Sequence, residues 1–152
     1  MSRVTRIVSG VVATSALVAA APVAEGGRKF TTMMTGQAEI VGGALTADLY
    51  AGGTVRVFVN PGQRRVCWEF EDLVNVDPMI SNAHIHPGEI DETGPPVVHF
   101  FNGTANVDLE GCTASNLDRR LLVDIIQNPQ NYYVNLHTTV YPGGAIRGQL
   151  SK

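Results

Sequence analysis

Short segments in which apolar and polar residues alternate recur along this chain of 152 residues, separated by turns that contain glycine and proline. Residues 54–59 and 65–70 alternate in this way, and Asn60-Pro61-Gly62 between them is a strong turn sequence. Alternation with a period of two places the apolar side chains on one face, which is typical of a half-buried β-strand. Short strands joined by such turns indicate an antiparallel sandwich or barrel, so the pattern predicts an all-β fold.

The same criteria predict strands in other parts of the chain. They cover residues 30–37, 83–86, 97–101, 105–109, 132–139 and 145–150. Residues 45–50 also alternate, and Gly52-Gly53 after them marks a turn. We therefore predict that residues 45–50 and 54–59 form a hairpin.

One segment departs from the strand pattern, because leucine and isoleucine recur at helical spacing between Ser115 and Pro129. Ser115, with Asp118 three residues later, is a weak variant of a capping box, and Asn128-Pro129 would end a helix. The sequence therefore predicts one short helix near residues 116–127, which packs against the strands.

The first two dozen residues differ in composition from the rest of the chain. Arg3 and Arg6 precede an apolar stretch over residues 7–21, which is shorter than the roughly 20 residues that span a bilayer. A positive segment followed by an apolar segment with a small-residue end is typical of a secretory signal. We therefore predict that residues 1–20 are a signal peptide, cleaved after Ala20, and that the protein is exported to the periplasm or the extracellular space.

The remaining chain is predicted to be a flexible lead over residues 21–29 and a single domain over residues 30–152. Removal of Arg3 and Arg6 leaves 11 − 2 = 9 basic against 14 acidic residues, a net charge of 9 − 14 = −5. The sequence shows no basic cluster that could neutralise a phosphate backbone, so we expect no nucleic acid partner. No membrane span is expected after cleavage. The sequence leaves open that the domain binds an unidentified extracellular or envelope protein.

Cys67 and Cys112 are the only two cysteines, and no CxxC spacing suggests a metal or redox site. In an exported domain a disulfide is the default state of such a pair. Closing a loop of about 45 residues should stabilise the fold by roughly 3–4 kcal/mol on the chain-entropy model.

All four histidines lie in the second half of the chain, and they are the residues most suited to bind a metal at neutral pH. In a strand, His84 and His86 point to the same face, because alternate side chains do so. His137 lies on the polar face of the strand predicted over residues 132–139, where it could supply a third ligand. His99 is the lone polar residue of an apolar strand, so it could be a fourth ligand or a buried histidine satisfied by one hydrogen bond.

Three or four imidazoles without a thiolate suit copper or zinc, and the absence of clustered carboxylate ligands argues against calcium. The alternative left open is that His84, His86 and His137 hydrogen-bond across a strand junction and hold loops in place without a metal.

Arg147 follows a Pro-Gly-Gly turn and places one fixed cation on the last predicted strand. It could pair with an internal carboxylate, which we favour, or steer a small anion toward a metal. Glu89, Asp91 and Glu92 follow the histidine pair and are interpreted as a solvated acidic rim. Their negative field counts against an enzyme that attracts an anion.

Several segments together resemble one known domain family. They are Ala83-His84-Ile85-His86-Pro87-Gly88, Gly94-Pro95-Pro96-Val97-Val98, residues 128–138 and Pro142-Gly143-Gly144-Ala145-Ile146-Arg147-Gly148-Gln149-Leu150, with looser agreement at Thr35-Gly36-Gln37-Ala38-Glu39 and Val66-Cys67-Trp68. The chain resembles the CHRD domain, a module named after chordin and found in exported microbial proteins. This resemblance implies an immunoglobulin-like β-sandwich with a distant similarity to copper/zinc superoxide dismutases.

In the dismutases, a strand with two alternate histidines, a later histidine and one near the C-terminus bind copper. His84, His86, His99 and His137 follow the same order, but the chain has no further histidines for a zinc-binding loop. The resemblance thus implies a copper-only site at most, with zinc the less favoured ion. The first hypothesis is a secreted binding or structural module that holds copper, and the alternatives are a copper-only dismutase-like enzyme and a metal-free structural envelope protein.

Overall fold

The computed structural model describes residues 27–39, 47–104 and 107–152. The predicted signal peptide and most of the predicted lead lie outside these residues. Within them, no helix is both long enough and apolar enough to cross a membrane.

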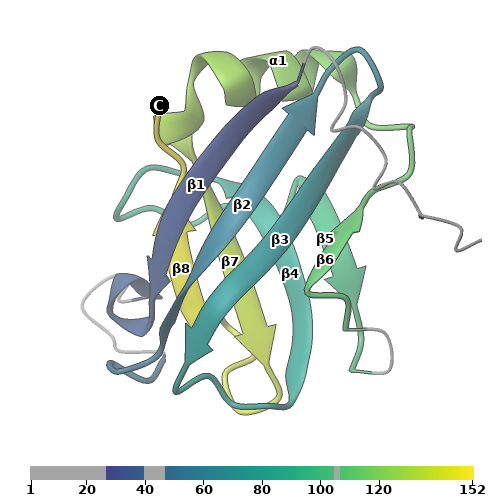
Figure 1. Ribbon diagram of the computed structural model, residues 1–152. Coiled ribbons are helices and arrows are strands. Elements are labelled where there is room, and N and C mark those ends of the chain that lie inside the picture. Colours follow the sequence, from purple (N-terminus) through teal and green to yellow (C-terminus); the bar gives the residue numbers. More distant parts are fainter. Residues whose placement is uncertain (1–26, 40–46, 105–106) are drawn as a thin grey trace, which may run out of the picture.

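Eight strands form one antiparallel sheet, so the predicted all-β fold is confirmed (Figure 1). Their bounds are β1 Arg28–Thr35, β2 Gly52–Asn60, β3 Arg65–Val74, β4 Ile80–Pro87, β5 Val98–Asn102, β6 Glu110–Cys112, β7 Tyr132–Thr138 and β8 Ile146–Gln149. The order across the sheet is β5-β4-β7-β8-β1-β2-β3-β6. One α-helix, α1 (Arg119–Gln127), and two short 3-10 helices, η1 (Gly36–Glu39) and η2 (Pro129–Asn131), complete the described elements.

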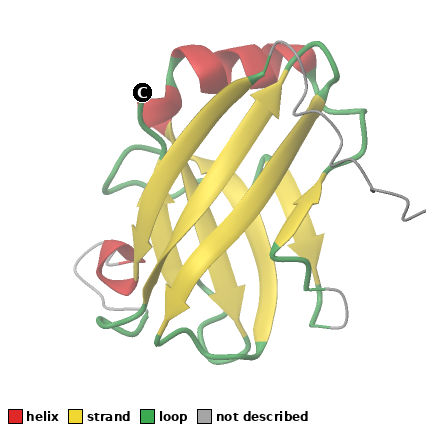
Figure 2. Cartoon of the chain, in the orientation of Figure 1, coloured by secondary structure: helices red, strands yellow, loops and turns green. Residues whose placement is uncertain are grey.

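The sheet folds over on itself into a barrel-like sandwich, with β1, β2 and β3 facing β4 and β7 and with α1 across one end (Figure 2). The core lies between these halves, because inward residues such as Val57 of β2, Ile85 of β4 and Val134 of β7 are fully buried. Trp68 of β3 stacks on Phe100 of β5, with ring centroids 4.8 Å apart, and so joins strands from opposite ends of the sheet order.

The predicted hairpin between residues 45–50 and 54–59 is wrong. Residues 45 and 46 lie outside the described part, and residues 47–50 form a bend and a turn. Gly52 and Gly53 are not the turn but the start of β2, which pairs from Gly52 to Val59 with the threonine-rich β1. A side chain at Gly53 would meet the end of the Leu73 side chain at 2.6 Å and the backbone oxygen of Glu71 at 3.2 Å, so glycine lets Leu73 of β3 pack closely over this position.

The predicted helix is confirmed but begins later, because Asp118, not Ser115, is its N-cap and accepts a hydrogen bond from the backbone N–H of Arg120. The residues before the cap are engaged elsewhere. The guanidinium of Arg64 donates to the carbonyls of Asn116 and Leu117, which ties this segment to the turn between β2 and β3. The strand predicted over residues 105–109 is also displaced, since β6 covers residues 110–112 and residues 105 and 106 lie outside the described part.

The predicted disulfide is present. Cys67 of β3 and Cys112 of β6 are directly opposite one another in the ladder and are bonded. The bond fastens the short edge strand β6 to the rest of the sheet.

Candidate metal centre

His84, His86 and His137 converge on the outer face of the sheet. Ala83 and Ile85, which alternate with the first two, are fully buried in the core, so His84 and His86 point the other way. In the ladder between β4 and β7, His84 is opposite Asn135, which places His137 diagonally across from it. One ring nitrogen from each of the three histidines lies within 4.8 Å of the others.

The cluster is covered although it lies on the outer face, because the three histidines are only 7–8% exposed. Two loops contribute to its surroundings. The loop between β4 and β5 supplies the carbonyl of Gly94, and the loop between β7 and β8 supplies the carbonyl of Pro142. Each carbonyl contacts one histidine ring.

These contacts assign the tautomers of two histidines. His86 Nδ1 is 2.8 Å from the Gly94 oxygen, and His137 Nδ1 is 3.0 Å from the Pro142 oxygen. A carbonyl can only accept, so both Nδ1 atoms carry the proton and both Nε2 atoms present a lone pair. His86 Nε2 is buried and has no hydrogen-bond partner.

His84 completes the arrangement. Its Nε2 is 3.3 Å from Oδ1 of Asn102, and its Nδ1 is 3.3 Å from His137 Nε2. With the amide oxygen of Asn102 as acceptor, His84 Nδ1 also presents a lone pair. Two lone pairs then face one another without a proton between them, an arrangement that a shared cation relieves.

Burial keeps these rings neutral at pH 7. It lowers the pKa of His84 to about 4, and it also lowers the pKa values of His86 and His137 below the usual range. In each case the hydrogen-bond acceptor opposes the shift but does not cancel it. Neutral imidazole is the form that binds a metal ion.

His99 lies at the rim of the cluster. It is opposite His84 in the ladder between β4 and β5, and their ring centroids are 4.7 Å apart. Its side chain is exposed, and it is outside the group of three whose nitrogens converge. The structure therefore places His99 beside the candidate site and not within it.

Arg147 lies next to the candidate site, but its guanidinium is engaged in other contacts and is not free to act on the histidines. Only 2% of this residue is exposed, and its guanidinium carbon lies 3.4 Å from the centroid of the Tyr133 ring. Tyr133 in turn stacks on His86, with centroids 4.9 Å apart and planes 5° apart. Arg147 also donates hydrogen bonds to the carbonyls of Glu89 and Glu92, so it holds the acidic loop that carries Gly94.

Glu39 is a buried neighbour of Arg147 that was not singled out from the sequence as a site residue. It is 3% exposed, and its carboxylate accepts a 3.4 Å hydrogen bond from the amide of Asn135. Burial raises its pKa to about 7, against the opposing effects of Arg147 and Asn135. A side chain at Gly144, where φ is +142°, would meet the Glu39 carboxylate at 2.5 Å, so the turn before β8 is shaped around it.

The raised pKa of Glu39 predicts a specific pH dependence. Because the folded state binds this proton more tightly than the unfolded state, the contribution of Glu39 to stability falls as pH rises from about 4.5 to about 7. The shift corresponds to about 3 kcal/mol at most. Glu39→Gln should remove that loss, so the variant should gain free energy of unfolding relative to the wild type between pH 5 and pH 8 in urea titrations. If the difference in free energy of unfolding between the variant and the wild type stayed constant across this pH range, the raised pKa of Glu39 would be contradicted.

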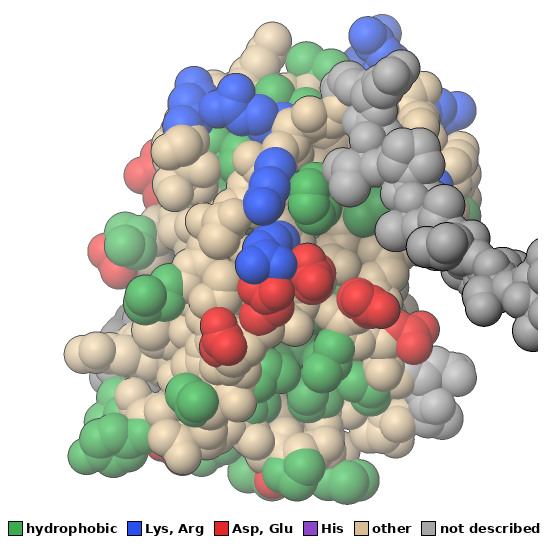
Figure 3. Space-filling model, in the orientation of Figure 1, with side chains coloured by type: hydrophobic (Ala, Val, Ile, Leu, Met, Phe, Trp, Pro, Cys, Tyr) green, Lys and Arg blue, Asp and Glu red, His purple; other side chains and the backbone are tan. Residues whose placement is uncertain are grey.

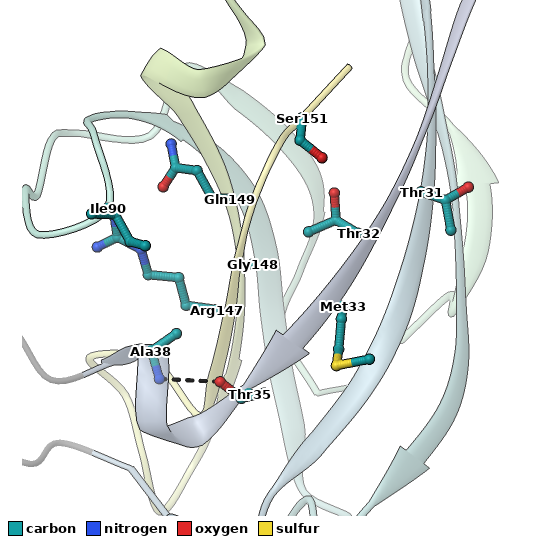
Figure 4. A pocket seen from close by; sticks show the side chains of 10 residues that line it. All are labelled: Thr31, Thr32, Met33, Thr35, Ala38, Ile90, Arg147, Gly148, Gln149 and Ser151. Carbon is teal, nitrogen blue, oxygen red and sulfur yellow. Dashed lines mark hydrogen bonds between the residues drawn. The ribbon is translucent and has the colours of Figure 1, made fainter.

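A cleft of about 290 Å³ opens beside β1 and β8, where the two strands pair only between Thr35 and Arg147 (Figure 4). Thr32, Met33 and Gln149 are among its lining residues. None of the three converging histidines lines this cleft, so it is separate from the candidate metal centre.

Comparison with known proteins gives one match. A family model described as CHRD domain matches residues 30–150. No curated protein and no solved structure matches the chain significantly.

Proposed function

The chain belongs to the CHRD domain family, and from this premise we propose that it is a secreted CHRD-domain module that holds a copper ion through His84, His86 and His137. The disulfide between Cys67 and Cys112 supports an oxidising location outside the cytoplasm. The predicted signal sequence over residues 1–20 supports the same location.

One observation carries the proposal, namely the buried Nε2 atom of His86. It is an acceptor without a donor, and such an atom costs free energy when it is removed from water. A metal ion between the three rings would satisfy it together with the lone pairs of His84 and His137. Metal–imidazole bonds of about 2 Å require ligand nitrogens about 3–4 Å apart, so a small inward movement from the observed limit of 4.8 Å is sufficient.

The donor set favours copper over zinc. Three neutral imidazoles without thiolate or carboxylate suit both ions, and copper binds such nitrogen sites more tightly than zinc in the general order of metal affinities. The carbonyls of Gly94 and Pro142 and the amide oxygen of Asn102 would accept hydrogen bonds from the three rings and so fix the orientation of the rings toward the ion.

A metal-free arrangement is the competing interpretation, and it depends on the orientation of the Asn102 side-chain amide. If its amide is reversed, it donates to His84 Nε2, and His84 Nδ1–H can then donate to His137 Nε2. This chain of hydrogen bonds satisfies His84 and His137 without an ion. It leaves His86 Nε2 without a partner, which is why we favour the metal.

The surroundings of the three histidines favour stable binding of the ion over catalytic turnover at the ion. The three rings are almost completely covered, and the guanidinium of Arg147 is used in hydrogen bonds to loop carbonyls and in its contact with Tyr133. The exposed Glu89, Asp91 and Glu92 would oppose the approach of an anion such as superoxide.

Metal analysis of the exported protein tests the proposal. After loading with copper and extensive dialysis, we expect one copper per chain in the wild type, less than about a tenth of that in His84→Ala and His137→Ala, and preference for copper when zinc is present in equal amount. A wild type that retains no stoichiometric metal would exclude the metal site. A superoxide-decay assay of the loaded protein distinguishes the alternatives, since acceleration beyond that of free buffer would favour the dismutase-like enzyme.

A further inference from the structure

Basic side chains gather at the end of the sandwich that α1 covers, although the sequence shows no basic run there. Six of the nine lysines and arginines beyond residue 26 belong to three short segments at this end, Arg28-Lys29, Arg64-Arg65 and Arg119-Arg120, which we call the basic end. In the space-filling view, blue side chains lie mostly toward this end and red ones across the middle (Figure 3).

Contacts show that the three segments are neighbours. The first pair begins β1 opposite Val59 and Phe58, at the end of β2. The second pair closes the turn between β2 and β3, where Arg65 is opposite Asn60. Arg64 then binds the carbonyls of the segment that leads directly into Arg119 and Arg120.

Within the part of the chain that the structure describes, no ion pair neutralises the charge of the basic end. Among the described residues, Arg56 in the middle of β2 makes the recorded ion pairs, to Glu69 and Glu71, and no member of the basic end does. Arg64 uses neutral carbonyls as partners. The nearest carboxylate in sequence, Asp118, caps α1 through the backbone of Arg120.

The opposite end of the sandwich has a different surface. It carries Asp72 near the end of β3, and Asp48 and Asp77 in the segments before β2 and after β3. No lysine or arginine lies in those segments, since Arg56 is in the middle of β2, Arg147 is buried and Lys152 is at the C-terminus beside α1 (Figure 1). The described lysines and arginines are therefore concentrated at the α1 end, where they lie among Asp118 and Asp124 of the α1 segment and near the acidic loop of residues 89–92, which leaves β4 beside η2.

We propose that the basic end lies against an anionic membrane surface, with lipid headgroups as its ligands. Charge complementarity supports this partner, because basic residues close to an anionic leaflet each strengthen binding about fivefold. None of the large exposed hydrophobic side chains lies in residues 27–32, 58–67 or 113–131, which surround the three basic segments, so we expect the contact to be with headgroups and not by insertion.

The place where the chain enters the domain supports the same partner. The apolar stretch predicted to enter the membrane during export ends at Ala21, and the first described residue, Gly27, lies beside Asn60 at the basic end. The five residues between them can reach at most about 20 Å. This end is therefore the one that faces the bilayer when the domain emerges, and the basic end would keep it there. The proposal does not depend on the metal site.

Vesicle sedimentation with the exported protein tests the proposal. At about 50 mM salt we expect binding to phosphatidylcholine vesicles that contain about 30 mol% phosphatidylglycerol, and loss of binding at about 500 mM salt, where charges are screened. Vesicles of phosphatidylcholine alone measure any apolar contribution. Equal binding to both kinds of vesicle, or no binding at low salt, would overturn the proposal.

Two variants with the same net charge locate the surface. Arg119→Gln should weaken binding to the anionic vesicles about fivefold, whereas Arg56→Gln, outside the basic end, should change it less than about twofold, with circular dichroism showing that both are folded. Equal losses would mean that net charge alone is responsible and would overturn the proposal. Binding of duplex DNA without binding of the vesicles would also overturn it.

Discussion

Replacement of His86 by alanine is expected to weaken copper binding at least about a hundredfold, because loss of a residue that only hydrogen-bonds to a metal ligand typically costs about 10- to 100-fold. His86 supplies the one buried ring nitrogen of the three that has no other partner. Its removal leaves two imidazoles, His84 and His137, which still face each other at 3.3 Å. Competition with a copper chelator of known affinity, followed by metal analysis, measures the change.

His99→Ala is the matched control, since it removes an imidazole beside His84 that is exposed and outside the converging group. We expect this variant to bind copper within about threefold of the wild type, because His99 is exposed and is not one of the three converging ligands. The metal-free form of His86→Ala should remain folded, because the substitution removes an unpartnered acceptor, although the hydrogen bond to the Gly94 carbonyl and the stacking on Tyr133 are lost. Equal losses in the two variants would contradict the three-histidine site.

The convergence of the histidines could be predicted because it depends on the period of a β-strand. Alternation along β4 fixes His84 and His86 on one face, and the antiparallel register of β7 brings His137 beside them. The tautomers could not be predicted in this way. They depend on the carbonyls of Gly94 and Pro142, whose positions are set by two loops without a regular repeat.

Other features could not be predicted because they depend on contacts between residues that are far apart in the sequence. The alternation of residues 45–50 suggested a local hairpin, but β2 pairs instead with β1, a partner that local sequence cannot identify. Glu39 meets Asn135 across 96 residues, and only its place in the Thr35-Gly36-Gln37-Ala38-Glu39 segment gave a signal. The basic end was missed for the same reason, because its charges are dispersed in sequence and gathered only by the fold.

Replacement of Trp68 by alanine is expected to lower the free energy of unfolding by about 3–5 kcal/mol, the range for large aromatic truncations in a core. Trp68 is 5% exposed and stacks on Phe100, so it joins β3 to β5 across the core. Its indole N–H donates a 2.8 Å hydrogen bond to the carbonyl of Asp108, which would lose this donor. Urea titration followed by circular dichroism measures the change, because the variant removes the only tryptophan as a fluorescent probe.

Tyr50→Ala is the control for the loss of an aromatic side chain, since Tyr50 is 81% exposed and its truncation should change stability by less than about 0.5 kcal/mol. Trp68→Phe separates two contributions at the buried position. It retains a ring that can stack on Phe100 but removes the hydrogen bond to Asp108, and we expect it to cost about 1–3 kcal/mol. If Trp68→Ala were no more destabilising than Tyr50→Ala, the contact between β3 and β5 could not be what holds the two ends of the sheet together.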